Sequence, residues 1–445
     1  MQAAHGSYSV WLTPTHNNAA WGRKSDIKHG RRIEGVIFPP RAKNFSFGLL
    51  LFAKNEEEAI FSSCFISCNT YQNSHIPFTS YKRYIHFQAK MKPTGVLMVG
   101  SVPGASPHDV FVRLTAALPG RLQAIPDGET GERWNYIGWQ LGRFPPVARR
   151  NELGGSPLPE SGPGLPTFTL ADIKPTAYDE AALSSYNEFK KLRQQNVIPS
   201  HVRFQIGLPS PYSVLAGHLK PELAVTIEPL YEQRFAETID RIVAGIPHDD
   251  VVIQWDLCFE MTALEFDRGR LLDTRHQAYF SSPSGVLQGL VERIVRLSER
   301  IPKDVKFAFH LCYGDLRHKH FIEPQDTSLL VELANALLAY ETIGSRTEWI
   351  HLPVPKGRTD SDYFSPLKGL KLEKIGSKRP YIYLGLVHAN DGAGTKKRIE
   401  TAQDSVPFPF GVATECGLGR TPPEEIDSIL EICREVTSEP IRENL

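Results

Sequence analysis

Eight short apolar runs recur along this chain, and segments long enough to form helices separate them. The runs occupy residues 95–101, 122–129, 202–208, 250–256, 305–312, 348–353, 381–388 and 410–416. A strand of a parallel sheet reads as a continuous apolar run, because helices cover both of its faces. Eight such strands alternating with helices predict an α/β protein with the (β/α)8 architecture of a TIM barrel.

The segments between the runs carry the helical pattern. Apolar residues recur at helical spacing in residues 109–118, 180–196, 221–245, 286–300, 329–340 and 392–402. A final helix is predicted after Thr421, where two prolines and two glutamates make a favourable first turn. Residues 143–175 are instead rich in Pro, Gly and Ser, and a loop of this length on the catalytic side of a barrel favours a lid.

The first 92 residues differ from the rest of the chain. They mix His, Asn, Ser and basic residues without a sustained helical or strand period. We therefore expect residues 1–92 to form a poorly ordered extension that contributes no chemistry. The barrel is expected over residues 93–445.

Composition and charge narrow the class of protein. The chain has 50 Lys plus Arg and 50 Asp plus Glu, so its formal net charge is zero. Such a balance provides no basic field for a nucleic acid or an anionic membrane. No run reaches the roughly 18 apolar residues that a membrane span requires. Six cysteines at irregular spacing suit reduced thiols, so we expect a cytoplasmic enzyme.

Residues of catalytic types stand where the apolar runs end, and barrel enzymes carry their chemistry at that end of the strands. His310 and Cys312 share one strand face, because side chains alternate along a strand. Cys416 ends the eighth run, which lies on the same rim in a closed barrel. One imidazole and two thiols are ligands that suit Zn2+. The alternative is a packed histidine with buried cysteines and no metal.

Five short motifs at these strand ends resemble one known family. They are Val99-Gly100-Ser101-Val102-Pro103, Asp127-Gly128-Glu129, Gln254-Trp255-Asp256, His310-Leu311-Cys312-Tyr313 and Glu415-Cys416-Gly417-Leu418. Together they resemble the catalytic, C-terminal barrel of cobalamin-independent methionine synthase, within the wider group that also contains uroporphyrinogen decarboxylase-like barrels. The resemblance runs through roughly residues 92–437.

The resemblance implies roles for the matched residues. His310, Cys312 and Cys416 would bind Zn2+. The backbone of Gly100 and Ser101, with the carboxylates of Glu129 and Asp256, would hold an amino-acid thiol. The zinc-bound thiolate would attack a methyl group, which in the family is carried by reduced folate. Separately from the motifs, Arg420 suits a substrate carboxylate or phosphate through a bidentate contact, or forms a surface ion pair.

The chain departs from the family pattern at three strands. After strand four, the family's Asp-Glu-Pro is replaced by Asp256-Leu257-Cys258. The family's fourth zinc ligand is a glutamate at the end of strand six, where this chain has His351; either His351 substitutes or the site has three protein ligands. Strand seven carries Asp-x-His in the family and His388-Ala389-Asn390 here. The predicted catalytic residues are therefore Asp256, His388 and Asn390, with a general acid required on the same rim.

These features support three functions. The first is a zinc-dependent transferase for a small-molecule thiol and a methyl donor such as reduced folate. The second is a metal-free lyase or decarboxylase of the uroporphyrinogen decarboxylase type. The third is a catalytically lapsed barrel that serves in binding.

Overall fold

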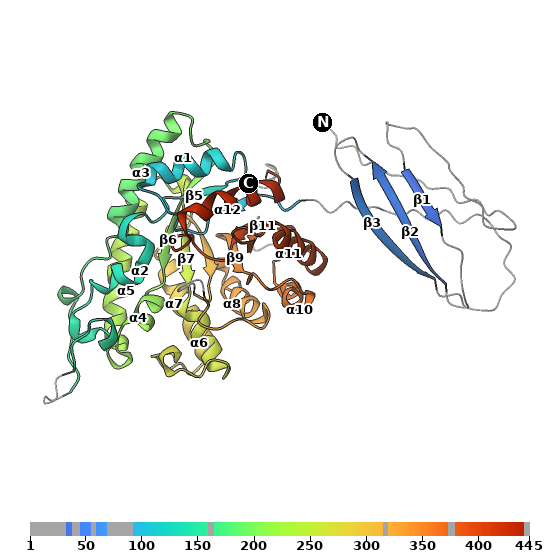
Figure 1. Ribbon diagram of the computed structural model, residues 1–445. Helices are drawn as coiled ribbons and strands as arrows, with labels where there is room; N and C mark the ends of the chain where they lie inside the picture. Colours follow the sequence, from blue (N-terminus) through green and yellow to red (C-terminus); the bar gives the residue numbers. More distant parts are fainter. Residues whose placement is uncertain are drawn as a thin grey trace, which may run out of the picture. The chain divides into compact units, whose positions relative to one another are not determined.

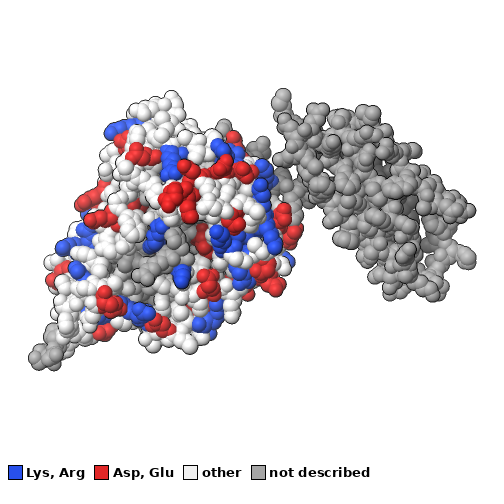
Figure 2. Space-filling model, viewed as in Figure 1, with Lys and Arg blue, Asp and Glu red and all other residues white. Residues whose placement is uncertain are grey.

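The computed structural model describes residues 33–37, 45–54, 59–68, 92–158, 164–314, 319–372 and 379–439. The chain divides into two compact units, Met1–Ala89 and Lys90–Leu445. Within the described residues, no helix combines the length and the apolar character needed to cross a membrane. Lys and Arg side chains are interspersed with Asp and Glu over the face shown in Figure 2.

The second unit is built on one sheet of eight parallel strands, as the eight apolar runs predict (Figure 1). The strands are β4 (Val96–Leu97), β5 (Ala124–Pro126), β6 (Arg203–Pro209), β7 (Val251–Leu257), β8 (Lys306–Leu311), β9 (Thr347–Pro353), β10 (Tyr381–Val387) and β11 (Gly411–Thr414). From β5 to β11 each strand pairs with the next one in sequence, and β11 pairs back to β4. A parallel bridge between Ser101 and Gly128 joins the two ends of the sheet, so the barrel is nearly closed.

Helices surround the strands, and the predicted ones are present. They are α1 (Pro107–Ala117), α3 (Tyr178–Gln194), α5 (Pro221–Gly245), α7 (Val286–Ser298), α8 (Ser328–Leu338), α11 (Gly392–Ser405) and α12 (Ile426–Val436). The sequence pattern did not predict the short helices α2 (Tyr136–Leu141), α4 (Pro211–His218), α6 (Phe259–Asp267), α9 (Glu341–Gly344) and α10 (Ser361–Phe364). In α4 nearly every side chain is buried, so the helix has no polar face and lacks an amphipathic period.

Apolar side chains fill the interior of the barrel, which confines any cleft to the rim. The interior layer comprises Leu97, Val99, Ala124, Val252, Ala308, Trp349, Tyr383 and Ala413. Gln254 lies above this layer and accepts a hydrogen bond from the Trp349 indole at 3.1 Å. A packed interior of this kind is usual for an eight-stranded barrel, and it leaves the carboxyl ends of the strands for function.

The Pro- and Gly-rich segment 143–175 contains three short 3-10 turns, η2 (Pro146–Ala148), η3 (Asn151–Leu153) and η4 (Leu170–Asp172). Residues 159–163 of this segment lie outside the described residues. The Lys220 ammonium donates to the backbone carbonyl oxygens of Val147 at 2.8 Å and Ser156 at 2.9 Å. One part of the predicted lid is therefore fixed to the start of α5.

The first unit contains three strands that the sequence pattern did not predict. They are β1 (Ile33–Ile37), β2 (Phe45–Lys54) and β3 (Ala59–Cys68), and they form an antiparallel sheet in the order β1-β2-β3. The other residues of the predicted extension, up to residue 91, lie outside the described residues.

Candidate metal centre

Three of the predicted metal ligands lie together at the rim of the barrel. His310 is in β8, Cys312 follows that strand, and Cys416 follows β11. The Cys312 and Cys416 sulfur atoms are 3.6 Å apart, and the Cys416 sulfur is 3.7 Å from His310 Nε2. One ligand atom from each residue lies within 4.8 Å of the other two. The predicted convergence of the fifth and eighth strands is therefore confirmed.

The chemistry of these three side chains fits a zinc ion. Two cysteine sulfurs and one imidazole nitrogen form a common zinc donor set, and three protein ligands leave one position open for a substrate. Contact with the neighbouring Cys258 thiol, assisted by burial, raises the pKa of Cys312 well above its usual value. A bound cation would reverse this, because a coordinated thiol loses its proton outright. The Gly314 amide also donates to the Cys312 sulfur at 3.2 Å.

His351 lies directly behind His310, and it is not part of the group of three. Its Nδ1 is 2.7 Å from Nδ1 of His310, and its Nε2 is 3.0 Å from the carbonyl oxygen of Thr414. Burial lowers the pKa of His351 to about 3. Burial, together with the neighbouring His351, also lowers the pKa of His310 well below its usual value. Both rings are therefore neutral at pH 7.

A cleft of about 720 Å³ opens beside the three ligands. Its other lining residues are Val99, Gly100, Ser101, Glu129, Trp134, Tyr136, Asp256, Cys258, Phe259, Gly314, Phe321, Gly417 and Arg420. The structure thus brings all the predicted substrate-binding residues to the same cleft as the metal ligands.

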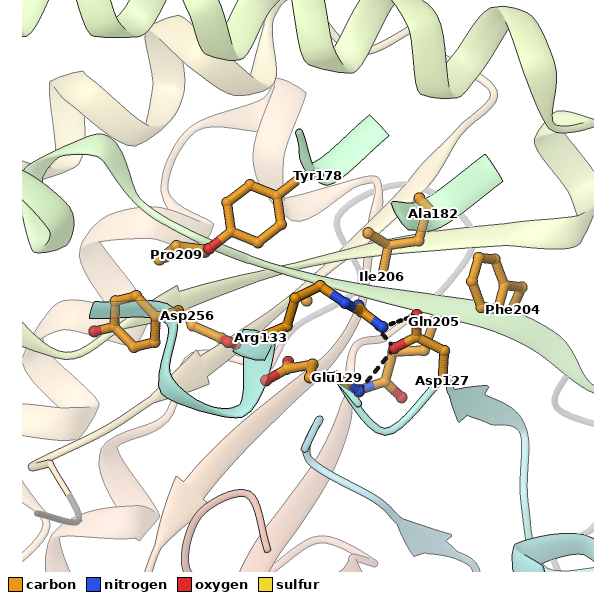
Figure 3. A pocket seen from close by; sticks show the side chains of 12 residues that line it. Asp127, Glu129, Arg133, Tyr178, Ala182, Phe204, Gln205, Ile206, Pro209 and Asp256 are labelled. Atoms are coloured by element: carbon orange, nitrogen blue, oxygen red, sulfur yellow. Dashed lines mark hydrogen bonds and ion pairs between the residues drawn. The ribbon is translucent and has the colours of Figure 1, made fainter. Parts of the chain in front are cut away.

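A smaller hollow of about 460 Å³ adjoins this cleft and shares Glu129, Tyr136 and Asp256 with it (Figure 3). On its floor the Arg133 guanidinium donates two hydrogen bonds to Asp127, at 3.2 and 2.8 Å. Asp127 also accepts a hydrogen bond from the Ser185 hydroxyl at 2.6 Å. The Asp127 carboxylate is therefore held by hydrogen bonds to Arg133 and Ser185. Glu129 and Asp256 instead line both the cleft and the smaller hollow.

Glu129 and Asp256 form an acidic pair with perturbed pKa values. Burial, and next the charge of Asp127, raises the pKa of Glu129 to about 7. Burial and the charge of Glu129 raise the pKa of Asp256 well above its usual value. The two carboxylates converge over Gly207, where an added Cβ would lie 2.9 Å from Glu129 Oε1 and 3.5 Å from Asp256 Oδ2. A cation between them would return both groups to the charged form.

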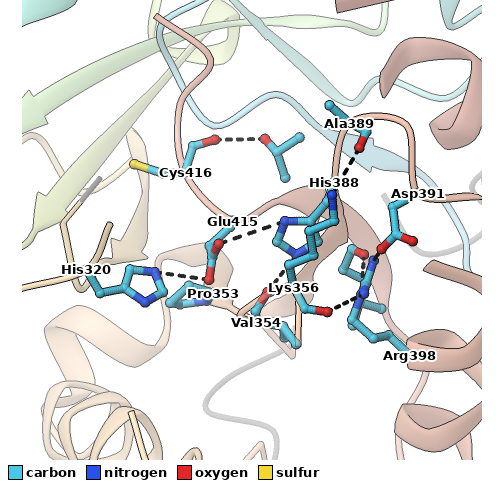
Figure 4. Close-up of polar contacts among 12 residues, drawn as sticks. His320, Pro353, Val354, Lys356, His388, Ala389, Asp391, Arg398, Glu415 and Cys416 are labelled. Carbon is cyan, nitrogen blue, oxygen red and sulfur yellow. Dashed lines mark hydrogen bonds and ion pairs between the residues drawn. The ribbon is translucent and has the colours of Figure 1, made fainter. Parts of the chain in front are cut away.

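The predicted catalytic residues of strand seven lie elsewhere. His388 donates from Nε2 to the Val354 carbonyl oxygen at 2.9 Å, and its Nδ1 is 3.9 Å from Glu415 (Figure 4). Asn390 is exposed, with its amide nitrogen 3.5 Å from Glu425. Neither side chain is among the described residues that line the cleft, whereas Asp256 is. No described residue of the predicted lid lines it either.

Glu415 links the strand-seven histidine to the loop after β8. His320 Nε2 is 3.0 Å from Glu415 Oε1, and His320 Nδ1 is 3.2 Å from Glu323 (Figure 4). Burial alone would lower the pKa of His320, but the two carboxylates outweigh it and raise the pKa to about 9. The resulting ion pair holds the segment that precedes Cys416.

Several lining residues were missed in the sequence. Cys258 directly follows β7, so its position at a strand end was a usable signal. Tyr136, Phe259 and Phe321 come from short helices and a loop, which carry no periodic pattern. Trp134 also lines the cleft and is 46% exposed.

Comparisons with known proteins give likeness in structure alone. No family model and no curated protein matches this chain. One similar solved structure is a B12-independent methionine synthase from Shewanella sp. W3-18-1 in complex with selenomethionine, with 13% identity, 77% of this chain and 96% of that chain covered, and a TM-score of 0.46. Another is a putative vitamin-B12 independent methionine synthase from Listeria monocytogenes, with 14% identity, 78% and 98% covered, and a TM-score of 0.43.

Proposed function

We propose that this chain is a zinc-dependent transferase that acts on a thiol substrate, and that the group it transfers is methyl. The observation that carries the proposal is the group of His310, Cys312 and Cys416 at the side of a small-molecule cleft. A zinc ion bound there would lower the pKa of a substrate thiol, so that the sulfur is ready to react at neutral pH.

The cleft offers complementary groups for the other end of an amino-acid thiol. The acidic pair of Glu129 and Asp256 would hold the substrate ammonium group, and its raised pKa values would then fall. Arg420 would hold the carboxylate, together with the backbone of Gly100 and Ser101. Ser101 is itself positioned by the Gly419 amide, which donates to its hydroxyl at 3.0 Å.

The transfer is balanced when the thiol proton reaches the donor. The substrate sulfur attacks the methyl carbon, a sulfur–carbon bond forms, and the carbon–nitrogen bond of a reduced-folate donor breaks. The electron pair of that bond stays on the donor nitrogen, which takes up the proton that the thiol released. Of the predicted catalytic residues, Asp256 lines the cleft and can carry this proton; a part for His388 or Asn390 remains a prediction.

The acidity of the cleft argues against a metal-free lyase of the uroporphyrinogen decarboxylase type. Such an enzyme needs cationic side chains for an acidic substrate. The cleft presents Arg420 but also Glu129 and Asp256, and Arg133 of the adjoining hollow is paired with Asp127. A polycarboxylate would lie beside two acidic side chains there, and ionisation of either would repel it.

Metal analysis of the purified chain tests the first half of the proposal. We expect about one zinc ion per chain, lost in Cys416→Ala and retained in Cys433→Ala. Cys433 is a suitable control because it is equally a cysteine but is buried on the apolar side of α12. A chain that binds no zinc would overturn the proposal in favour of a metal-free enzyme or a binding protein.

Formation of methionine from homocysteine and methyl-tetrahydrofolate tests the second half. The zinc-loaded chain should form product, and the Cys416→Ala chain should not. If the protein binds zinc but forms no methionine from these two substrates, the proposed metal centre stands and the proposed reaction is refuted.

A further inference from the structure

We propose that His351 positions His310 for metal binding by fixing its tautomer, and that His351 is not itself a ligand. This inference rests on the metal centre of the proposed function. It assigns a role to a buried imidazole that the cleft does not contact. It also accounts for a histidine at the strand-six position where the sequence pattern predicts a fourth ligand.

The barrel strands place the two rings side by side. His310 in β8 and His351 in β9 are direct partners in the parallel register, so their side chains point to the same side of the sheet. The ring centroids are 4.8 Å apart at 46°, and the exposed fractions are 3% and 0%. Both rings are therefore held by packing, and neither has room to turn toward water.

The donor and acceptor nitrogens of the two imidazole rings can be assigned by starting from the carbonyl oxygen of Thr414. The Thr414 carbonyl oxygen only accepts, so His351 Nε2 at 3.0 Å carries the proton. In the neutral ring, Nδ1 of His351 is then the acceptor. The 2.7 Å contact between the two Nδ1 atoms needs one donor, which must be His310. His310 is consequently protonated at Nδ1 and carries its lone pair at Nε2.

That lone pair faces the ligand group. His310 Nε2 is the atom that lies 3.7 Å from the Cys416 sulfur. Metal-bound histidines usually donate their other N–H to a fixed acceptor, which sets the ring orientation and makes the nitrogen a better ligand. Here that acceptor is an imidazole held by the backbone of β11.

Residue Thr414 of strand β11 contacts both His351 and the turn that carries Cys416. Thr414 in β11 accepts the His351 proton through its carbonyl oxygen, and its hydroxyl donates to the Cys416 carbonyl oxygen at 2.8 Å. The residue that fixes the tautomer therefore also fixes the turn carrying the second cysteine ligand. If His351 bound the ion through Nδ1 instead, His310 would lose its acceptor while remaining buried, which is unfavourable.

Nitrogen-15 NMR of the histidines tests the tautomers without any activity measurement. In full-length protein near pH 7, we expect His310 protonated at Nδ1 and His351 at Nε2, before and after zinc is added. Spectra of His310→Asn and His351→Asn assign the two signals among the 15 histidines. A His310 protonated at Nε2, or a positively charged ring at either position, would overturn the proposal.

Metal affinity tests the consequence, with a chelator competition for zinc and cobalt. His351→Phe keeps an aromatic ring at this position but removes the acceptor, and we expect affinity to fall about 10–100-fold. His351→Asn supplies an amide oxygen near His310 and should restore most of the loss. His218→Phe removes an equally buried imidazole from α4 and should leave affinity unchanged.

The cobalt absorption spectrum separates a positioning residue from a ligand. At saturating cobalt, His351→Phe should retain the sulfur-to-metal charge-transfer intensity and the d–d band positions of the unaltered chain. Shifted d–d bands would identify His351 as a ligand and refute the positioning role. If the unaltered chain binds neither metal, the proposed function fails, while the NMR tautomers still decide whether His351 orients His310.

Discussion

Replacement of Glu129 by Gln should stabilise this protein at neutral pH, although Glu129 lies in the proposed substrate site. The carboxyl group is surrounded by Asp127 and Asp256 and is largely removed from water, so its charged form is disfavoured. Gln keeps the shape and cannot ionise. The replacement therefore removes an unfavourable charge from the cleft.

The size and sign of the effect follow from the two pKa values. The pKa of Glu129 is about 7 in the folded chain against 4.5 ordinarily, chiefly because of burial. Between these values the folded state binds more protons than the unfolded state, so stability falls as pH rises from about 4.5 to 7. The full difference corresponds to roughly 3 kcal/mol. Because Glu129 is partly exposed, solvent screening reduces the expected effect to about 1–2 kcal/mol.

Urea unfolding at about pH 5 and about pH 8 measures this effect. Glu129→Gln should gain stability over the unaltered chain at the higher pH, and the gain should shrink at the lower pH. Glu132→Gln, an exposed position in the same loop, is the matched control and should change little at either pH. An equal pH dependence in the unaltered chain and in Glu129→Gln would refute the reasoning.

The same replacement should weaken binding of the substrate ammonium group. A charge that costs stability and lines a cleft is the signature of a functional residue, since selection retains it against its folding cost. Calorimetry with homocysteine should show weaker binding to Glu129→Gln. It should also show that binding to the unaltered chain releases protons, because the bound cation lowers the pKa of Glu129.

Arg133→Met should cost about 3–5 kcal/mol, because it leaves the buried Asp127 charge without its guanidinium partner; urea unfolding measures this, and no loss would contradict it. His320→Gln should cost more stability at about pH 6 than at about pH 10. Burial lowers the pKa of His320, but Glu415 outweighs it and raises the pKa from 6.5 to about 9. The ion pair's contribution to stability is therefore complete below pH 6.5 and disappears as pH rises through 9. If His320→Gln lowered the urea midpoint of unfolding by the same amount at both pH values, this reasoning would be refuted. Arg420→Met should weaken homocysteine binding about tenfold with unchanged zinc content, and unchanged binding would place the carboxylate elsewhere.

The barrel and the ligand group were predictable because both depend on simple periodicity. Parallel strands covered on both faces must be continuously apolar, so the eight runs were visible without knowledge of contacts. Closure of the sheet then places the ends of β8 and β11 on one rim. His310 in β8 and Cys312, which directly follows the strand, are two residues apart in extended backbone and therefore share a face. These steps need no side-chain detail.

Other features depend on contacts that leave no periodic signal. Helix α4 is buried on all sides, so its apolar residues form no stripe. The sequence places His351 on the strand that the structure shows as β9. Its role, however, depends on the contacts of its two ring nitrogens with His310 and with the Thr414 carbonyl oxygen. The strands of the first unit were missed although β2 is a largely apolar run, and β2 and β3 pair along their whole length.

Strand β10 shows how the backbone places the predicted catalytic pair, His388 and Asn390, outside the residues that line the cleft. Its register against β11 shifts between Leu384 and Val387, so one extra residue interrupts the alternation of faces. Beyond the strand, Asn390 adopts a left-handed φ of 56°, and Asp391 begins α11 by accepting from the Gly394 amide. The chain after β10 thus turns directly into α11, and Asn390 is exposed there, with its amide nitrogen 3.5 Å from Glu425 and outside the residues that line the cleft.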